Sequence, residues 1–257
     1  MPATYVATHL AEARVDYATA QKRVDLMLVR SLQPLRTPLW AVRTLTRNHL
    51  FFVAEPEKRV IRAVTPFTLL GVARLRSLWE LANAVIRDGV TGAFVECGCW
   101  NGGSGALLAK VATGGERATW LFDSFEGLPE PNAVDVTVRG EVGTAGDFIG
   151  SETKVREILG LVGPISEVQI VKGWFKDTLA HARTGPIAFL HVDVDLHDST
   201  LTVLEAFYDR VTPGGIVVFD DYAYWKGSRK AVDKFLMSRQ RPTIHRSGYP
   251  SVWIRKS

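Results

Sequence analysis

The sequence predicts an α/β protein built on a mostly parallel sheet, with an antiparallel hairpin at the end of the chain and a helical extension at its start. Two observations support this. From Ala93 onwards, short apolar runs alternate with segments of helical period, and such alternation is typical of doubly wound parallel sheets. Near the end, two short extended segments flank the Gly248–Pro250 turn, which predicts an antiparallel hairpin at one edge.

Seven strands are expected. The first five are apolar and suit a buried parallel sheet, and two short ones close the chain. Their predicted ranges are Ala93–Cys97, Thr119–Asp123, Val168–Lys172, Ile187–Asp193, Ile216–Phe219, Thr243–His245 and Ser251–Ile254.

Helices are expected between these strands. Apolar residues recur at helical spacing from Gly71 to Asp88, and Gly89 is placed to end that helix in a left-handed conformation. Further helices are predicted at Ser104–Val111, Glu152–Leu161 and Leu201–Arg210, and after a capping Ser228. The long connection from Ser124 to about Gly150 contains neither pattern, and a loop of this length is usually functional or a lid.

The first part of the chain is expected to be a separate helical extension. In residues 1–65 the helical pattern is interrupted by Pro34 and Pro38, whereas residues 66–257 contain the alternating pattern. We therefore predict a domain boundary between residues 65 and 66. The extension is expected to act as a lid or as a contact in a homodimer or larger homo-oligomer.

Composition argues against several classes of protein. The net charge of +4 comes without a nucleic-acid-reading motif. No run reaches the ~18 uncharged apolar residues that an integral membrane segment needs. Met1–Leu10 lacks a secretory pattern, and the two cysteines are too few for a disulfide framework. We therefore expect a cytoplasmic protein that acts on a small molecule.

Acidic pairs follow two of the apolar runs. Asp193 and Asp195 are two residues apart, so on an extended backbone they point to the same side, and Asp220 and Asp221 close the next predicted strand. Carboxylates this close together take up protons or need a cation, and oxygen ligands favour Mg²⁺. Phosphohydrolases of the haloacid dehalogenase type also have such pairs, but their nucleophile pair belongs on the first strand.

A glycine-rich loop follows the first predicted strand, from Glu96 to Ser104. Its glycines allow the backbone to approach a ligand, and the next helix offers free N–H groups. The spacing differs from the dinucleotide-binding fingerprint, and the acidic Glu96 suits a cationic ligand such as S-adenosylmethionine (SAM). Asp123, at the end of the second strand, is placed to accept hydrogen bonds from ribose hydroxyls.

Together these motifs resemble the macrocin O-methyltransferase (TylF-type) family. The similarity runs from about Thr91 to Leu236. It is carried by Phe94–Gly98 with Gly102–Ser104, by Phe122–Pro129, by Asp193–Thr200 and by Pro213–Tyr222. The resemblance implies the Rossmann-like fold of class I SAM-dependent methyltransferases. It also implies methylation of a sugar or phenol hydroxyl in antibiotic biosynthesis, with SAM and magnesium.

The resemblance also implies roles for individual residues. Asp193, Asp220 and Asp221 would bind the metal. The general base would be Asp195, although His197 stands where the family usually has tyrosine and is a second candidate. The SAM-binding residues would be Glu96, Gly98, Trp100, Ser104, Asp123, Ser124, Trp174 and Asp193. Tyr222 and Trp225 follow the second acidic pair, so they are the candidates for contact with the acceptor.

The acceptor itself stays open at this point. A deoxysugar of a glycosylated metabolite is favoured, and a catechol-type phenol is the alternative. A SAM-binding module without turnover is a further alternative, but an intact set of four carboxylates argues against it, because unpaired carboxylates are costly to keep together.

Overall fold

The computed structural model describes residues 56–163, 165–239 and 242–257. Contacts divide the chain into two units, Met1–Glu55 and Pro56–Ser257, and only the second is described below. The first 55 residues of the predicted extension therefore lie outside the described part. Within the described ranges, no helix combines the length and the hydropathy needed to cross a membrane.

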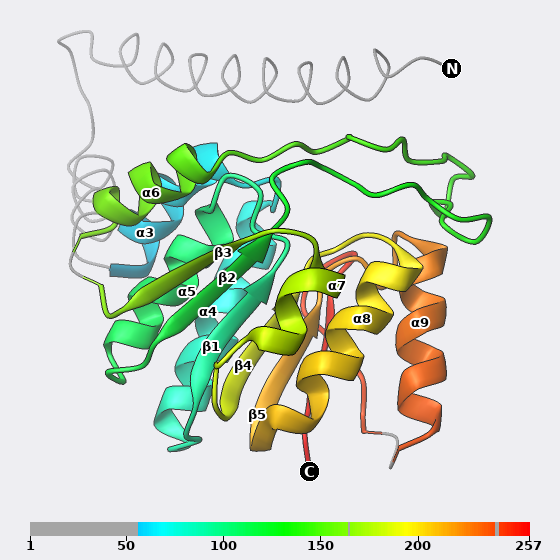
Figure 1. Cartoon of the computed structure of the whole chain (residues 1–257). Coiled ribbons are helices and arrows are strands. Elements are labelled where there is room, and N and C mark those ends of the chain that lie inside the picture. Colours follow the sequence, from blue (N-terminus) through cyan, green and yellow to red (C-terminus); the bar gives the residue numbers. More distant parts are fainter. Residues whose placement is uncertain (1–55, 164, 240–241) are drawn as a thin grey trace, which may run out of the picture. The chain divides into compact units, whose positions relative to one another are not determined.

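A seven-stranded sheet forms the centre of this unit (Figure 1), which confirms the predicted α/β fold. The strands are β1 (Ala93–Cys97), β2 (Thr119–Asp123), β3 (Val168–Lys172), β4 (Ile187–Val192), β5 (Val211–Phe219), β6 (His245–Arg246) and β7 (Val252–Arg255). Their order is β3-β2-β1-β4-β5-β7-β6. The first five pair in parallel, and β7 pairs antiparallel with both β5 and β6. The strand order reverses between β1 and β4, so this is where a crevice for ligands is expected.

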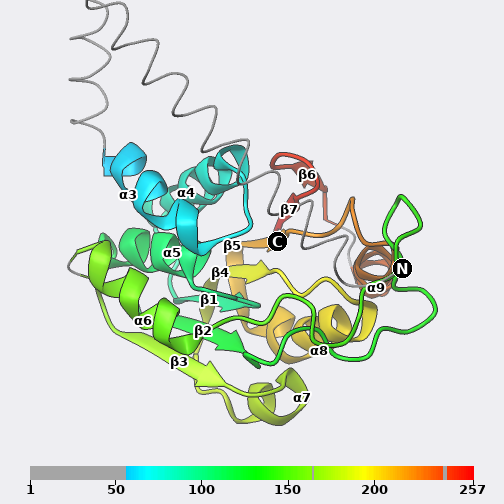
Figure 2. The same cartoon turned by 90° about the horizontal axis from the view of Figure 1, so that it is seen from above.

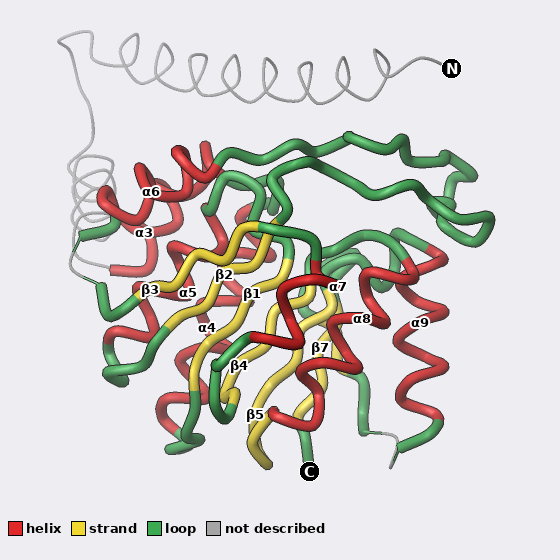
Figure 3. Tube along the Cα trace, viewed as in Figure 1, coloured by secondary structure: helices red, strands yellow, loops and turns green. Residues whose placement is uncertain are grey.

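Helices cover both faces of the sheet (Figures 2 and 3). One layer contains α3 (Pro56–Val64), α4 (Val72–Arg87), α5 (Gly103–Thr113) and α6 (Glu152–Leu161). The other contains α7 (Phe175–Thr178), α8 (His197–Phe207) and α9 (Lys226–Met237). Each layer encloses its own apolar core, because side chains alternate between the two faces of a strand. Phe94 packs in the first core, and Val95 in the second.

Several predicted boundaries are wrong. The helix predicted from Leu201 begins at His197, because the distant Asp135 accepts a hydrogen bond from the His197 N–H. Ser228 does not cap α9 but lies inside it, where its hydroxyl accepts a hydrogen bond from Thr200. The closing strands are displaced by one or two residues, and α7 was not predicted. α3 falls within the predicted helical extension of residues 1–65 but packs into the core of the sheet unit.

The long connection predicted after β2 crosses the carboxyl ends of the strands and reaches α9 before it returns to α6 (Figures 1 and 2). We call this segment, Ser124–Gly150, the strap. It is ordered by backbone pairing between Val136 and Val142 and between Thr137 and Trp225. The strap therefore lies against the segment that follows β5.

Candidate active site

The carboxyl ends of β1 and β4 meet at unusually close range. Gly98 follows β1 with a positive φ of 82°, and a Cβ at this position would lie 1.8 Å from the carbonyl oxygen of Asp193. Hydrogen bonds continue the sheet on both sides of this contact, from Gly98 N–H to Phe122 and from Asp193 N–H to Cys97. The glycine is thus required by the approach of β4, which places the glycine-rich loop beside the first acidic pair.

Asp123 holds the glycine-rich loop in place. One of its carboxylate oxygens accepts hydrogen bonds from the N–H groups of Cys99 and Trp100, at 2.9 and 2.8 Å. The other accepts from the N–H of Phe125 at 2.7 Å. Trp100 adopts a φ of 49°, a conformation that costs energy for a non-glycine residue. Asp123 therefore stabilises the turn that leads into α5.

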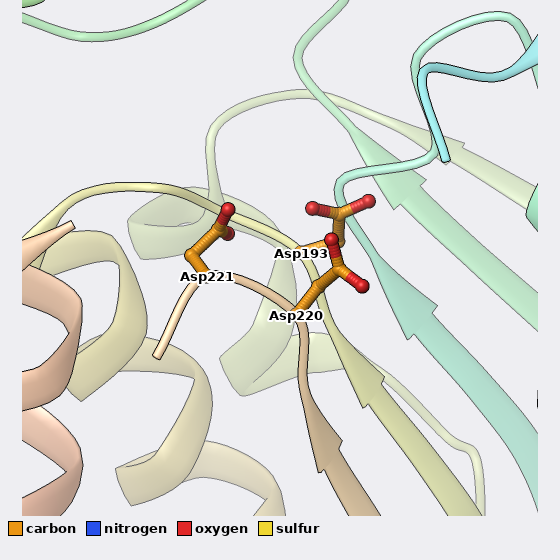
Figure 4. A group of neighbouring side chains, drawn as sticks. All are labelled: Asp193, Asp220 and Asp221. Atoms are coloured by element: carbon orange, nitrogen blue, oxygen red, sulfur yellow. The ribbon is translucent and has the colours of Figure 1, made fainter. Parts of the chain in front are cut away.

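Three carboxylates converge at the ends of β4 and β5 (Figure 4). Asp193, Asp220 and Asp221 each offer an oxygen, and these oxygens lie within 4.8 Å of one another. Burial and the charge of Asp220 raise the pKa of Asp193 well above its usual range. Burial and the charges of Asp195 and Asp193 do the same to the pKa of Asp221. Oxygen ligands that repel one another at this spacing fit a hard divalent cation such as Mg²⁺.

Asp220 differs from its two neighbours because it has partners of its own. Arg74 of α4 forms an ion pair with one oxygen, and the hydroxyl of Ser251 donates to the other at 2.6 Å. Burial alone would raise the pKa of Asp220, but His191 and Arg74 outweigh it, so the pKa is lowered. Asp220 thus stays ionised, with its orientation fixed from two sides.

Glu96 and His191 form a fully buried ion pair behind this acidic cluster. Glu96 Oε1 lies 2.8 Å from His191 Nδ1, and His191 Nε2 lies 3.8 Å from Asp220 Oδ1. Burial would lower the pKa of His191, but the carboxylates of Asp220 and Glu96 raise it to about 10. The histidine is therefore a cation at neutral pH, and the Glu96 carboxylate that sequence assigns to SAM already has a partner within the sheet.

Asp195 lies next to the acidic cluster in a left-handed conformation, with a φ of 57°. Its N–H donates to Asp221 at 2.9 Å, and the side chain of Trp225 is a neighbour that lowers the pKa of its carboxylate. Burial and the charge of Asp220 raise the pKa of Asp195 to about 6, although Trp225 and Asp221 oppose the shift. The carboxylate is thus near the pKa that suits a general base at neutral pH.

The two aromatic residues predicted to contact the acceptor have different surroundings. Trp225 is only 4% exposed and packs against Leu128 of the strap and Leu196. Tyr222 is partly exposed, and its hydroxyl donates to Asp233 of α9 at 2.8 Å. Trp225 therefore faces inward against Leu196, the neighbour of Asp195, while Tyr222 leans towards α9.

The other predicted site residues lie around the same edge of the sheet. Ser104 is buried in the first turn of α5. Ser124 closes a turn in which its hydroxyl accepts from the N–H of Glu126, and Trp174 precedes α7. His197 is the first residue of α8, and its Nδ1 lies 2.6 Å from the exposed carboxylate of Asp198. All the predicted positions thus lie on elements that end or begin at the carboxyl edge.

Sequence reasoning missed four residues of this site: Arg74, Asp135, His191 and Ser251. For His191 a signal was available, because it precedes Asp193 by two residues and an extended strand places both on one side. The others come from a helix, a loop and the terminal hairpin, and their approach to the site depends on tertiary structure alone.

The sequence profile described as Macrocin-O-methyltransferase (TylF) matches residues 51–256. The chain belongs to this family. The match includes the glycine-rich loop, Asp123, both acidic pairs and the strap, so the whole carboxyl edge lies within the matched range. The predicted family resemblance, which was drawn from Thr91 to Leu236, is confirmed and extends further in both directions.

Curated relatives are named as O-methyltransferases of natural products. The chain is 39% identical over 163 residues to the 8-demethyl-8-(2,3-dimethoxy-alpha-L-rhamnosyl)-tetracenomycin-C 4'-O-methyltransferase of Streptomyces olivaceus. The aligned region covers 61% of this chain and 62% of that protein. It is 34% identical over 200 residues to the demethyldecarbamoylnovobiocin O-methyltransferase of Streptomyces niveus, covering 70% and 73%. A third relative is the mycinamicin III 3''-O-methyltransferase of Micromonospora griseorubida, at 32% identity.

Solved structures confirm the predicted class I methyltransferase fold. The O-methyltransferase NovP superposes with a TM-score of 0.64 at 30% identity, over 74% of this chain and 82% of its own. The calicheamicin methyltransferase CalS11 superposes with a TM-score of 0.59 at 21% identity, over 86% and 94%. Since CalS11 is so distant in sequence, that comparison supports the fold alone.

Proposed function

We propose that this protein transfers a methyl group from SAM to a hydroxyl of a glycosylated natural product, with Mg²⁺ bound at the acidic cluster. The observation that carries the proposal is the convergence of Asp193, Asp220 and Asp221 beside the glycine-rich loop. In a member of an O-methyltransferase family, this convergence supports a cation site next to the expected cofactor site.

SAM would lie along the glycine-rich loop at the start of α5. Gly98, Trp100 and Ser104 would surround its methionine part, and Asp193 would lie below the sulfonium. Asp123 would accept hydrogen bonds from the ribose, since each carboxylate oxygen has two lone pairs and the loop uses only some of them. Ser124 and Trp174 would lie towards the adenine. Glu96 would act on SAM through its negative charge, because its carboxylate is buried against His191.

The chain's own residues would position the acceptor and move a proton. Asp193, Asp220 and Asp221 would hold the divalent cation, which when bound lowers the pKa of a coordinated hydroxyl. Asp195 would take the proton from that hydroxyl, with Trp225 and the Asp195 backbone contact to Asp221 holding it in place. Most of the rate gain would come from holding the hydroxyl in line with the methyl group.

The acceptor class is inferred from the relatives. The Streptomyces olivaceus relative carries a rhamnosyl acceptor in its name, which favours a deoxysugar hydroxyl over a free phenol here. Two expectations from the sequence stay predictions. One is that the protein is cytoplasmic, and the other is that residues 1–65 act as a lid or as a contact in a homo-oligomer.

An acceptor panel tests the proposal. The full chain is incubated with Mg²⁺ and SAM carrying a trideuterated methyl group, together with rhamnosylated polyketides, other deoxysugar glycosides and catechols. Mass spectrometry should find one labelled methyl group on a glycoside. Labelling of catechols alone would move the protein to the phenol class. Binding of S-adenosylhomocysteine without labelling of any acceptor would favour a SAM-binding module.

A further inference from the structure

The middle of the strap is fastened by one buried carboxylate. Asp135 is 1% exposed. Its Oδ1 accepts a hydrogen bond of 2.7 Å from the N–H of His197, the first residue of α8. Its Oδ2 accepts from the N–H of Asn132 at 3.0 Å, which closes a turn inside the strap. The carboxylate thus joins the strap to the positive end of the α8 dipole, where a negative charge is favourable.

The same carboxylate also occupies a space left by a glycine in α9. A Cβ on Gly227 would lie 1.9 Å from Asp135 Oδ1, far inside any possible contact. Gly227 lies in the first turn of α9, where alanine would ordinarily stabilise a helix. Asp135 therefore lies between the first turns of α8 and α9, and the absence of a side chain at Gly227 is what makes room for it.

This attachment determines how the strap covers Trp225. Beside Asp135, the N–H of Lys226 donates to Val136 at 2.9 Å, and the N–H of Val138 donates to Tyr224 at 2.8 Å. Leu128 and Phe148 of the strap pack around the indole of Trp225. The indole of Trp225 also packs on Leu196, the residue next to Asp195. A continuous set of contacts therefore runs from Asp135 through the strap to the segment that carries the proposed base.

The cofactor side of the strap is fastened separately. The indole N–H of Trp100 donates to the carbonyl of Ile149 at 3.1 Å. A Cβ on Gly150 would lie 2.4 Å from the carbonyl oxygen of Trp100, so the two backbones are in direct contact there. Because these contacts do not involve Asp135, the middle of the strap can be released while the glycine-rich loop keeps its neighbours.

We propose that Asp135 is a positioning residue that locks the strap onto α8 and α9 and thereby holds Trp225 against Asp195 on the acceptor side of the site. The part concerning the acceptor rests on the proposed function, whereas the lock itself does not. Loss of Asp135 should weaken the acceptor side and leave the cofactor side intact.

Three variants and a control test the lock. Asp135→Ala removes the carboxylate, and Gly227→Ala displaces it from the other side. Asp135→Asn keeps an oxygen that can accept from His197 but loses the acceptor for Asn132, so its behaviour should lie between that of Asp135→Ala and wild type. Asp147→Ala is the matched control, because the Asp147 carboxylate accepts only a local strap hydrogen bond, from the N–H of Thr144 at 2.9 Å.

The first measurement needs no acceptor. Arg139 is the single basic residue in the strap sequence and lies exposed at its tip, so trypsin cleavage after it reports release of the strap. In Asp135→Ala and Gly227→Ala, cleavage should be at least ~10-fold faster than in wild type, as expected for loss of a charge-assisted hydrogen bond. Amide hydrogen exchange at Lys226 should also be faster in these two variants than in wild type. Unchanged cleavage and exchange in both variants would overturn the lock.

The second measurement separates the two sides of the site. Calorimetry should give an affinity for S-adenosylhomocysteine within ~2-fold of wild type in all variants, a difference too small to reflect a lost contact. With the acceptor labelled in the panel, kcat/KM should fall in Asp135→Ala and Gly227→Ala but not in Asp147→Ala. An equal loss of S-adenosylhomocysteine affinity would show a general structural role instead. If the panel labels no acceptor, the proposed function fails while cleavage and exchange still decide the lock.

Discussion

Asp195 and the three metal-binding candidates are all aspartates, but their surroundings assign them different tasks. Asp193, Asp220 and Asp221 have oxygens within 4.8 Å of one another, whereas the Asp195 carboxylate has Trp225 among the neighbours that change its pKa. The left-handed backbone at Asp195, with a φ of 57°, produces this separation, because a regular strand would point Asp195 to the same side as Asp193.

Replacing Asp195 tests its role as base. Asp195→Asn keeps the size of the side chain, but it cannot take a proton. We expect kcat to fall by roughly 10²–10⁴-fold, the usual contribution of a general base. Binding of Mn²⁺, followed by electron paramagnetic resonance, should be unchanged. A near-normal kcat in Asp195→Asn, together with a large loss in His197→Asn, would assign the base to His197.

The buried Glu96–His191 pair predicts a pH-dependent stability. In the folded protein the pKa of His191 is about 10, above the ~6.5 of an unfolded histidine. The pair therefore contributes fully below about pH 6.5, and its contribution declines as the pH rises towards 10.

Replacing the carboxylate tests this pair. Glu96→Gln should lower the free energy of unfolding by roughly 3 kcal/mol near pH 6, because it leaves a buried cation without its counter-charge. The difference from wild type should shrink near pH 9. Urea unfolding at several pH values measures both effects, and a difference that grows with pH would contradict the assignment of a charged His191.

At the level of elements, the close approach of β1 and β4 explains why the glycine-rich loop and the acidic cluster share one edge. Gly98→Ala would place a Cβ 1.8 Å from the carbonyl of Asp193. Backbone on both sides leaves no flexible side chain to move away, so the two strand ends must separate.

Comparison with a second glycine separates the effect of the steric clash from the effect of the backbone conformation. Gly140 also has a positive φ, of 84°, but a Cβ there meets no atom within 4 Å. Gly140→Ala should therefore cost roughly 1 kcal/mol of unfolding free energy, from conformation alone. Gly98→Ala should cost about 3 kcal/mol or more, with a loss of S-adenosylhomocysteine binding. Equal costs in chemical denaturation would contradict the steric explanation.

The elements also show where sequence reasoning succeeds and fails. The five apolar strands were predicted because a parallel sheet is buried on both faces and leaves a continuous hydrophobic signal. The start of α8 was misplaced because Asp135, more than sixty positions earlier, provides the acceptor for its first N–H. No local pattern marks such a contact, and the same holds for the approach of Arg74 to Asp220.

For the whole molecule, the sequence was sufficient to predict the α/β sheet, its antiparallel end and the edge on which the acidic residues meet. The reversal of strand order between β1 and β4 then explains why these residues face a common crevice. From the sequence, the strap could be described only as a long loop. Its path from β2 to α9 depends on contacts of Asp135 and Thr137 with Gly227 and Trp225, which lie far along the sequence and meet them only in the folded chain.

The metal dependence of methyl transfer tests the proposed chemistry most directly. The purified chain is stripped with EDTA, and transfer of the labelled methyl group from SAM to the glycoside acceptor is measured with and without added Mg²⁺. We expect a loss of at least ~10²-fold in kcat on stripping, full recovery with Mg²⁺, and no recovery in Asp221→Asn, since the cation stabilises charge at the reacting oxygen. Undiminished transfer by the stripped wild-type protein would contradict a metal site at Asp193, Asp220 and Asp221.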